Sequence, residues 1–486
     1  MATTREQAEA YAYENRRRTT SLIRGADEAR DDPRRRLNCA VGGGTAVGVL
    51  IMAGFGIAGW LGAGRGPDLP GSGAVVASGS GDRYVVAEGV VHPALNLASA
   101  LLVGGGEVTE VRQSALDEAP RGLPVGIPGA PDALPGRDDL VDDDWTLCAT
   151  PSETGGAPAD TALYVSVPGV APGGEGADGG STVLAQEEDG ALWLLTEGRR
   201  YALTPEIRDV LGLQRVTPVA LPRGIIAALP EGPEIAVPEA GGGAGGLPTV
   251  DLPFPAAVGD LAHIELGGAS PQFYVVRPDG LVAVSELVYT LLLTGDVTDH
   301  ELSGPDVARA ARSDDTAPGD PAWPETLPAA DEPERNQPVC VSTPPGAEPG
   351  DAPWRATVHL PPTMPEPEGV TAVAAGDGAR LGLLDRVYVP AGRGAVVRAV
   401  SSAGAGGTYT LVTDGGTAYP FASDEAVERL RYRPGDAPSV PRSFVALLPA
   451  GPALDPRAAA QEQRGEAAPE QDEPEDEGAE NEEETG

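Results

Sequence analysis

Lysine is absent from this 486-residue chain, and all 34 of its basic residues are arginine. A Walker A loop needs a lysine to reach the nucleotide phosphates, so the sequence cannot contain this ATP-binding motif. Histidine is scarce too, with four isolated residues and neither an HxxxH pair nor a CxxC element. The spacing that protein zinc sites require is therefore missing, and we expect neither a metal ion nor another cofactor.

Other signatures of catalysis and ligand binding are also missing. No G-x-S-x-G sequence supplies a hydrolase nucleophile, and the Gly-rich stretch 241–246 lacks the strand-to-helix context of a phosphate-binding loop. The acidic cluster at 138–144 lacks the glycine and the terminal glutamate of an EF-hand loop, which favours a solvated turn over a calcium site. The sequence therefore predicts no catalytic, cofactor-binding or metal-binding residues and favours a non-enzymatic role.

Aromatic residues make up only 4% of the chain, and 73 acidic residues outnumber the arginines to give a formal net charge of -39. A surface of this charge repels phosphates, which argues against nucleic-acid binding. The hydrophobic cores must be built largely from Val, Leu, Ile and Ala, because aromatic side chains are so few.

Acidic residues are densest at the C-terminus. Residues 462–484 carry twelve Asp and Glu, a single arginine and no large apolar residue. Such a segment buries too little surface to offset the entropy lost on ordering. We therefore expect residues 457–486 to form a disordered acidic tail, with partner or cation binding as the alternative.

One long uncharged stretch lies near the N-terminus. Residues 37–64 carry no charge, and they lie between three consecutive arginines at 34–36 and Arg65. A helix needs about 20 apolar residues to cross a bilayer, so we expect a single transmembrane helix over 37–63. The first 36 residues contain nine arginines, which places the N-terminus in the cytoplasm and the bulk of the chain outside it. The alternative, a cleaved export signal, normally has a shorter apolar region and a shorter leader.

The three cysteines fit this topology. Cys39 lies at the cytoplasmic end of the expected transmembrane helix, whereas Cys148 and Cys340 lie on the outer, oxidising side. Disulfides persist in such a compartment, and we predict a bond between Cys148 and Cys340. Two free buried thiols, or a bridge to another chain, are the alternatives.

Four segments share one local pattern. Each has an aromatic residue next to a run of β-branched or leucine residues, then an acidic residue with glycine that suits a tight turn, a second strand and a capped helix. These segments begin at Arg83, Leu192, Phe273 and Tyr409. We expect each to be a small module of two strands and a helix with further short strands.

A second sequence similarity links two of the modules. Residues 221–233 resemble residues 440–452 at an offset of 219, and Trp193 precedes Tyr409 by 216. Similar offsets in two places predict that the second and fourth modules are related over their whole length.

The less repetitive segments 120–168 and 335–400 each hold one outer cysteine, so we expect them to meet as a central domain. The fold class predicted is α+β, with an elongated region outside the cytoplasm made of this disulfide-linked domain and four small related modules. The expected divisions are a cytoplasmic basic segment (1–36), the transmembrane helix (37–63), module 1 (64–118), the first central-domain segment (119–180), module 2 (181–240), module 3 (249–334), the second central-domain segment (335–400), module 4 (401–456) and the tail (457–486).

Several motifs together resemble a known family. They are Arg83-Tyr84-Val85, the sequence HPALNLASA at 92–100, the sequence VGIPGAPDALP at 125–135, Trp145-Thr146-Leu147-Cys148, and residues 385–394. With the basic N-terminus and the single span, this combination resembles EccB, a membrane-core subunit of the actinobacterial type VII (ESX) secretion system. The resemblance covers nearly the whole chain apart from the acidic tail.

This resemblance implies a single-pass inner-membrane protein whose central disulfide-bonded domain is joined to four repeats similar to a phage-lysin cell-wall-binding module. It also implies the partners EccC, EccD, EccE and the protease MycP in a hetero-oligomer with multiple copies. We therefore expect a structural subunit that anchors the secretion complex and scaffolds its periplasmic side. The alternatives are a peptidoglycan-binding protein and an ATPase associated with the complex, an activity suggested for the family that the missing lysine argues against.

The predicted disulfide can be checked on gels. After thiol blocking, the region of the chain that follows the span is expected to migrate faster without reductant than with it, because an intramolecular bridge keeps the denatured chain compact. Alkylation of two outer thiols in the unreduced protein would contradict the bond.

Overall fold

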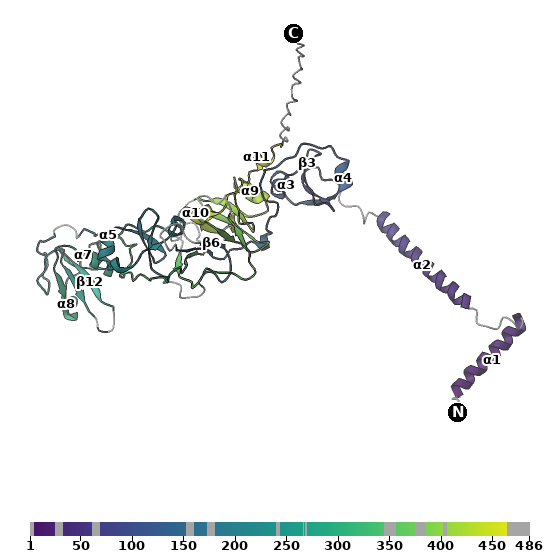
Figure 1. The fold of residues 1–486 in the computed structure, drawn as a ribbon, viewed down its shortest axis with the longest axis horizontal. Helices are drawn as coiled ribbons and strands as arrows, with labels where there is room; N and C mark the ends of the chain where they lie inside the picture. The colour runs from purple at the N-terminus through teal and green to yellow at the C-terminus, as the bar shows by residue number, and fades with distance from the viewer. Residues whose placement is uncertain are drawn as a thin grey trace, which may run out of the picture. The chain divides into compact units, whose positions relative to one another are not determined.

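The computed structural model describes residues 4–24, 33–60, 69–151, 160–172, 180–239, 244–265, 267, 270–344, 356–375, 384–401 and 406–463. It divides into two compact units, residues 1–69 with 110–112 and residues 70–109 with 113–486 (Figure 1). Each unit is described by itself.

The first unit contains two helices, α1 (Thr4–Arg24) and α2 (Pro33–Trp60). Helix α1 is rich in Ala, Glu and Arg, and Arg5 pairs with Glu9 and Glu14 with Arg18 at the i,i+4 spacing that favours helices. Among the described residues, no helix combines the length and the hydropathy that a membrane crossing requires. The span expected over 37–63 overlaps α2, and its last residues, 61–63, lie outside the described residues.

The second unit contains four small modules, each built around a short meander of strands. The first module consists of β1 (Gly73–Ser78), β2 (Arg83–Ala87), β3 (Val90–Pro93) and α3 (Leu97–Gly104), and α4 (Gln113–Asp117) follows along the chain. Between α3 and α4 lies β4 (Thr109–Arg112), whose residues 110–112 belong to the first unit. The second consists of β7 (Val183–Gln186), β8 (Leu192–Thr196), β9 (Arg199–Leu203), α5 (Pro205–Val210), β10 (Val219–Ala220) and α6 (Arg223–Ala228).

The remaining two modules repeat this plan. The third consists of β11 (Leu261–Ile264), β12 (Gln272–Arg277), β13 (Gly280–Val284), α7 (Glu286–Leu292), β14 (Asp299–Glu301) and α8 (Gly304–Arg309). The fourth consists of β19 (Gly394–Val400), β20 (Thr408–Thr413), β21 (Ala418–Pro420), α9 (Asp424–Arg429), β22 (Ser439–Pro441) and α10 (Arg442–Leu447). In modules two to four the strand order is third, second, first, fourth, with the first and fourth strands parallel.

Local sequence explains why these elements form. The β2–β3 and β8–β9 turns are Glu88-Gly89 and Glu197-Gly198, and φ is positive at all four residues, as a type I′ hairpin turn requires. The following helices begin at side-chain caps, in which Asn96, Thr204, Ser285 and Ser423 each accept a hydrogen bond from the backbone three residues on.

The register of the hairpins corrects one expected equivalence. Trp193 lies opposite Ala202, and the residue in this place in the fourth module is Thr410, opposite Pro420. Tyr409 is one position away and so points to the other face of its strand. The prediction that Trp193 and Tyr409 are equivalent, at an offset of 216, was therefore wrong by one residue.

A glycine beneath a ring recurs in three modules. After the helices, a short edge segment pairs in parallel with the third strand of each module. The second residue of this segment is a glycine in modules one, two and four, and any Cβ there would collide with a ring of the third strand. The pairs are Gly122 with His92, Gly232 with Tyr201, and Gly451 with Tyr419. Close approach of the edge segment to the sheet therefore requires glycine.

A fifth sheet is built from two segments far apart in the chain. Strands β5 (Trp145–Thr150) and β6 (Asp160–Val165) join β15 (Val339–Thr343), β16 (Thr357–His359), β17 (Ala372–Ala374) and β18 (Arg386–Tyr388) in the order β16-β15-β5-β6-β18-β17. We call it the central sheet.

Hydrophobic cores connect the sheets. The largest core joins the apolar side chains of the central sheet to Ile225 and Ile226 of α6 and to Phe444 of α10. The two similar segments, residues 221–233 and 440–452, therefore contact each other through α6 and α10. Gly224 allows Leu447 of α10 to approach closely. A second core joins the first and fourth modules, and a third joins the second and third.

Three segments belong to different regions of the fold than expected. Residues 394–400, assigned to the central domain, form β19 of the fourth module. Residues 121–125, also assigned there, pair with the end of β3 in the first module. Residues 457–463, assigned to the tail, include most of helix α11 (Pro456–Ala459), because Asp455 caps this turn and Ala459 is buried. These segments are short and lack the alternation of apolar residues that marks a strand.

The glycine beneath Tyr201 gives a stability prediction. Gly232→Ala is expected to lower the free energy of unfolding by about 1–3 kcal/mol, because the added methyl group overpacks a ring that is 1% exposed. Gly435→Ala is the matched control, since nothing lies within 4 Å of its Cβ. Urea unfolding measures both variants, and equal midpoints would contradict the role of Gly232.

Candidate functional site

The central sheet has two chemically different faces. One row across it consists of apolar side chains, in the order Val358, Val341, Leu147, Leu163 and Val387. This face packs against the helices α6 and α10. The neighbouring row, on the opposite face, consists of His359, Cys340, Cys148, Ala162 and Arg386. Strand alternation therefore places polar and sulfur-containing residues on one face.

The disulfide lies in the middle of this second face. Cys148 and Cys340 are directly opposite each other on β5 and β15, with their Cα atoms 4.1 Å apart, and they form the disulfide that the sequence predicts. Both residues are completely buried. The bond closes a loop of 192 residues, which in the chain-entropy model disfavours the unfolded state by about 5 kcal/mol.

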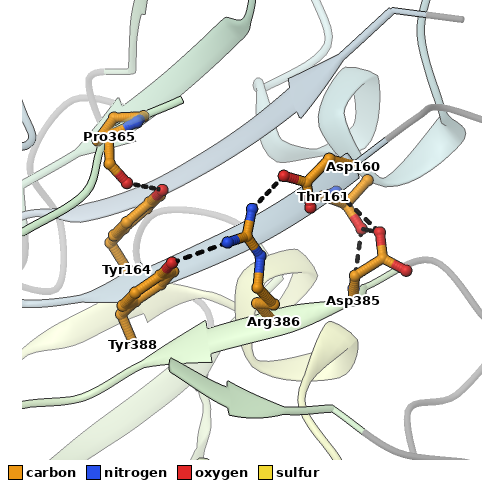
Figure 2. A network of polar contacts seen from close by, with 7 residues as sticks. All are labelled: Asp160, Thr161, Tyr164, Pro365, Asp385, Arg386 and Tyr388. Atoms are coloured by element: carbon orange, nitrogen blue, oxygen red, sulfur yellow. Dashed lines mark hydrogen bonds and ion pairs between the residues drawn. The ribbon is translucent and has the colours of Figure 1, made fainter. Parts of the chain in front are cut away.

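A polar network joins β6 and β18 (Figure 2). The Arg386 guanidinium donates to the carboxylate of Asp160 and to the hydroxyl of Tyr388. Burial works against the charge of Arg386, yet the hydrogen bond and ion pair with Asp160 keep its pKa above the usual value. This pair links the polar ends of neighbouring parallel strands.

Two tyrosines form the next section of the network. The rings of Tyr164 and Tyr388 stack with their centroids 4.7 Å apart, and the Tyr164 hydroxyl donates to the carbonyl of Pro365 at 2.6 Å (Figure 2). Burial is the main cause that raises the pKa of Tyr164, followed by the nearby Tyr388. Tyr164 therefore stays a neutral donor and fixes the segment around Pro365 over this face.

Asp385 joins the start of β18 to β6. Its carboxylate accepts hydrogen bonds from the backbone N–H of Thr161 at 2.8 Å and from the Thr161 hydroxyl at 2.7 Å. The backbone N–H of Asp385 lies 2.9 Å from the Thr161 hydroxyl oxygen. Every charged side chain of Figure 2 thus has a defined partner within the sheet.

The edge of the same face carries His359, directly opposite Cys340. Burial lowers the pKa of His359, although the backbone of Thr357 and Val170 favours the charged form. The imidazole is therefore neutral at neutral pH. Beside it, the hydroxyl oxygens of Thr146 and Ser342 are 2.8 Å apart across β5 and β15.

This arrangement holds strands together. The sulfur atoms are already bonded, and the ionised side chains of Figure 2 are engaged in ion pairs or hydrogen bonds. Within the portion of the chain that the structure describes, no three His, Cys, Asp or Glu side chains gather as a metal site requires. The expectation of no metal or catalytic residue stays a prediction.

The motif at 125–135 lies between two modules. Asn96 donates through its amide group to the carbonyl of Ile127 at 2.8 Å, and the Ser99 hydroxyl accepts from the Ile127 N–H at 2.8 Å. At the other end, the Tyr432 hydroxyl of the fourth module donates to the carbonyl of Pro135 at 2.8 Å. The motif therefore connects the first and fourth modules by hydrogen bonds to its irregular backbone.

Sequence reasoning found only a portion of this site. It identified both cysteines and the motif at 385–394, but it missed the partners Asp160, Thr161 and Tyr164. The sequence offered one signal for this site. Asp385, Arg386 and Tyr388 place polar and aromatic side chains at the start of a strand. Nothing local indicates which distant strand would pair with them.

The disulfide has a measurable structural role. In Cys148→Ser/Cys340→Ser, the central sheet is expected to loosen while the individual modules remain partly folded, because each module retains its own hairpins. Limited proteolysis and thermal unfolding measure this, with Cys39→Ser as the matched control. A protease pattern identical to that of the control would contradict the picture.

Comparison with known proteins identifies relatives of the whole arrangement. The family model described as "Type VII secretion system ESX-1, transport TM domain B" matches residues 1–468. The "ESX-2 secretion system ATPase EccB2" of Mycobacterium tuberculosis is 32% identical over 311 residues, covering 59% of this chain and 58% of that protein. The chain thus spans about three fifths of the length of this relative. The "ESX-3 secretion system ATPase EccB3" of Mycolicibacterium smegmatis is 29% identical over 423 residues, covering 79% of this chain and 77% of that protein.

Solved structures agree with these relatives. A chain in the "Structure of an intact ESX-5 inner membrane complex, Composite C3 model" matches with a TM-score of 0.62 and 26% identity, covering 96% of both chains. A chain in the "Structure of EccB3 dimer from the ESX-3 core complex" matches with a TM-score of 0.61 and 26% identity, covering 80% of this chain and 100% of that one. Motifs, fold and matched length agree, and the chain belongs to the EccB family of type VII (ESX) secretion proteins.

Proposed function

We propose that this protein is a structural subunit of an ESX inner-membrane complex, in which it anchors and scaffolds the periplasmic side for protein export. The observation that carries the proposal is the central sheet, where a buried disulfide and the bonds of Arg386 with Asp160 and of Asp385 with Thr161 join distant segments of the chain. Such a sheet holds distant segments of the chain in fixed positions.

The proposed topology follows from the sequence. Residues 37–63 would cross the inner membrane once, with the arginine-rich N-terminus in the cytoplasm and the modules in the periplasm. This placement suits the disulfide, because the periplasm is oxidising.

The proposed partners are EccC, EccD, EccE and MycP, with several copies of the chain in a hetero-oligomer. The similar chains come from structures described as an ESX-5 inner membrane complex and an EccB3 dimer, which supports assembly as the working state. The partner names themselves rest on family membership.

ATP hydrolysis is the first alternative, because the names of the relatives include the word ATPase. A phosphate-binding loop of the Walker type cannot form without lysine, and the chain has none. The Gly-rich stretch 241–246 gives no support, and residues 241–243 lie outside the described residues.

Peptidoglycan binding is the second alternative, motivated by the repeated modules. Stacking against a sugar requires an accessible aromatic face. Tyr84 and Tyr274 occupy equivalent places in the first and third modules, but they are only 7% and 3% exposed. Arg121 and Arg312 lie over these rings, at 5.4 Å and 4.7 Å from the ring centroids. The arginines therefore cover these rings, which disfavours them as sugar platforms.

Purification from membranes tests the proposal. The tagged full chain is expected to elute in mild detergent with other ESX subunits, in a particle far larger than its own 49.5 kDa. The Cys148→Ser/Cys340→Ser variant is expected to lose most of this assembly while Cys39→Ser keeps it, because only the former loosens the scaffold.

Two controls separate the alternatives. ATP turnover that follows the chain through every purification step would favour an ATPase, and retention of the region after the span on isolated peptidoglycan would favour wall binding. Elution of the native chain alone, without other subunits, would contradict the scaffold function.

A further inference from the structure

The last described residues, 455–463, leave the fourth module and pack on the first. Leu454 completes the fourth module by pairing in parallel with Phe421. The chain then continues to the surface formed by α3 and residues 124–126 of the first module. We call residues 455–463 the C-terminal strap.

The first half of the strap is a single helical turn. Asp455 accepts a hydrogen bond from the N–H of Arg457 at 2.9 Å, and Pro456 occupies the first helical position, which its ring favours. Ala459 is completely buried in the core shared with Leu101 and Leu102 of α3. A small side chain is therefore the apolar anchor of the strap.

The second half of the strap is extended and adds to an edge. Glu462 pairs in antiparallel fashion with Val125. The backbone N–H of Gln463 donates to the carbonyl of Pro124 at 2.7 Å, and its side-chain amide donates to the carbonyl of Gly126 at 3.0 Å. On its other side, Val125 pairs in parallel with Ala94 at the end of β3. The strap thus extends a small sheet by strand addition, a recurrent mode of peptide recognition.

The character of this contact is that of a docked peptide. Within the strap, Ala459 is the one fully buried side chain, and Gln461 and Glu462 are exposed. Gln463 donates one backbone and one side-chain hydrogen bond to the first module, and Ala459 adds one buried methyl group to the shared core. Direct linkage to Leu454 keeps the strap at high effective concentration near α3, so a modest intrinsic affinity is enough to hold it in place.

We propose that the first module carries a peptide-docking site, formed by α3 and the edge at residues 124–126, and that the strap is its ligand within the same chain. The site takes a short peptide with an Asp-Pro helix start, a small residue one turn on, and an extended end that donates to the edge carbonyls. Because the strap is tied to the fourth module, its docking fixes the first module against the fourth. Release of the strap exposes the edge.

The other contacts between these modules do not replace the strap. The Arg429 guanidinium of α9 donates to the carbonyls of Leu102 and Val103, at 2.5 Å and 3.3 Å, at the end of α3. This contact is at the C-terminal end of the helix and leaves the carbonyls of Pro124 and Gly126 to the strap. Removal of the strap therefore leaves the modules connected but uncovers one defined edge.

Truncation and addition of a peptide test the site. When the chain is truncated after Leu454, the rate of amide hydrogen exchange in residues 97–104 and 124–127 is expected to rise at least about tenfold over that of the full-length chain. A capped synthetic peptide of residues 455–463, added at millimolar concentration, is expected to restore the protection in trans. The same peptide with Ala459→Asp is expected to have no effect, because a carboxylate cannot enter the buried position. Unchanged exchange after truncation, or equal action of both peptides, would overturn the proposal.

A pair of variants in the full-length chain covers the case in which the truncated chain fails to fold. Ala459→Asp is expected to raise exchange in the same two segments, whereas Ala460→Asp, at an exposed neighbouring position, is expected to leave it unchanged. Identical exchange in these two variants would refute the docking site. The test does not depend on the secretion function, because it measures the isolated chain.

Discussion

The pairing of β5 with β15 is the interaction on which the rest of the second unit depends. Five residue pairs join strands whose cysteines are 192 residues apart, and the disulfide lies among them. Closing so long a loop costs entropy, and the covalent bond removes much of that cost from the unfolded state. Once these strands meet, the sheet presents one apolar face that receives α6 and α10. The second and fourth modules are positioned by this contact, and the first and third attach to them.

The four modules keep one plan while their side chains have diverged. A glycine beneath a ring holds the edge segment in three modules, but the third has Ser313 at this place. An arginine covers an aromatic ring in the first three modules, whereas the fourth has Thr410 in the place of the aromatic residue. Strand order is therefore the shared property, because hairpin turns and helix caps set it locally. Ring and cation pairs vary more freely, since they only reinforce a sheet that is already formed.

The chemistry of the chain suits a scaffold. Charged groups on the polar face of the central sheet are bound to partners, as Arg386 is to Asp160, and burial keeps Tyr164 and His359 neutral. The bonds of Arg386 with Asp160 and of Asp385 with Thr161 stabilise the pairing of β6 with β18. The strap joins two modules in a similar way, because Gln463 donates one backbone and one side-chain hydrogen bond to the edge and Ala459 is buried. These features support the scaffold role proposed above.

The sequence by itself determined the hairpins, the helix caps, the cysteine pair and the exclusion of a Walker loop, because each depends on residue type or on neighbours a few positions away. The tertiary structure decided the pairing of Asp160 with Arg386, the place of residues 394–400 in the fourth module and the docking of residues 455–463. It also corrected the equivalence of Trp193 by one residue. Strand alternation reveals which face a residue occupies but not which distant strand lies beside it. That choice is made by packing and loop closure across the whole chain.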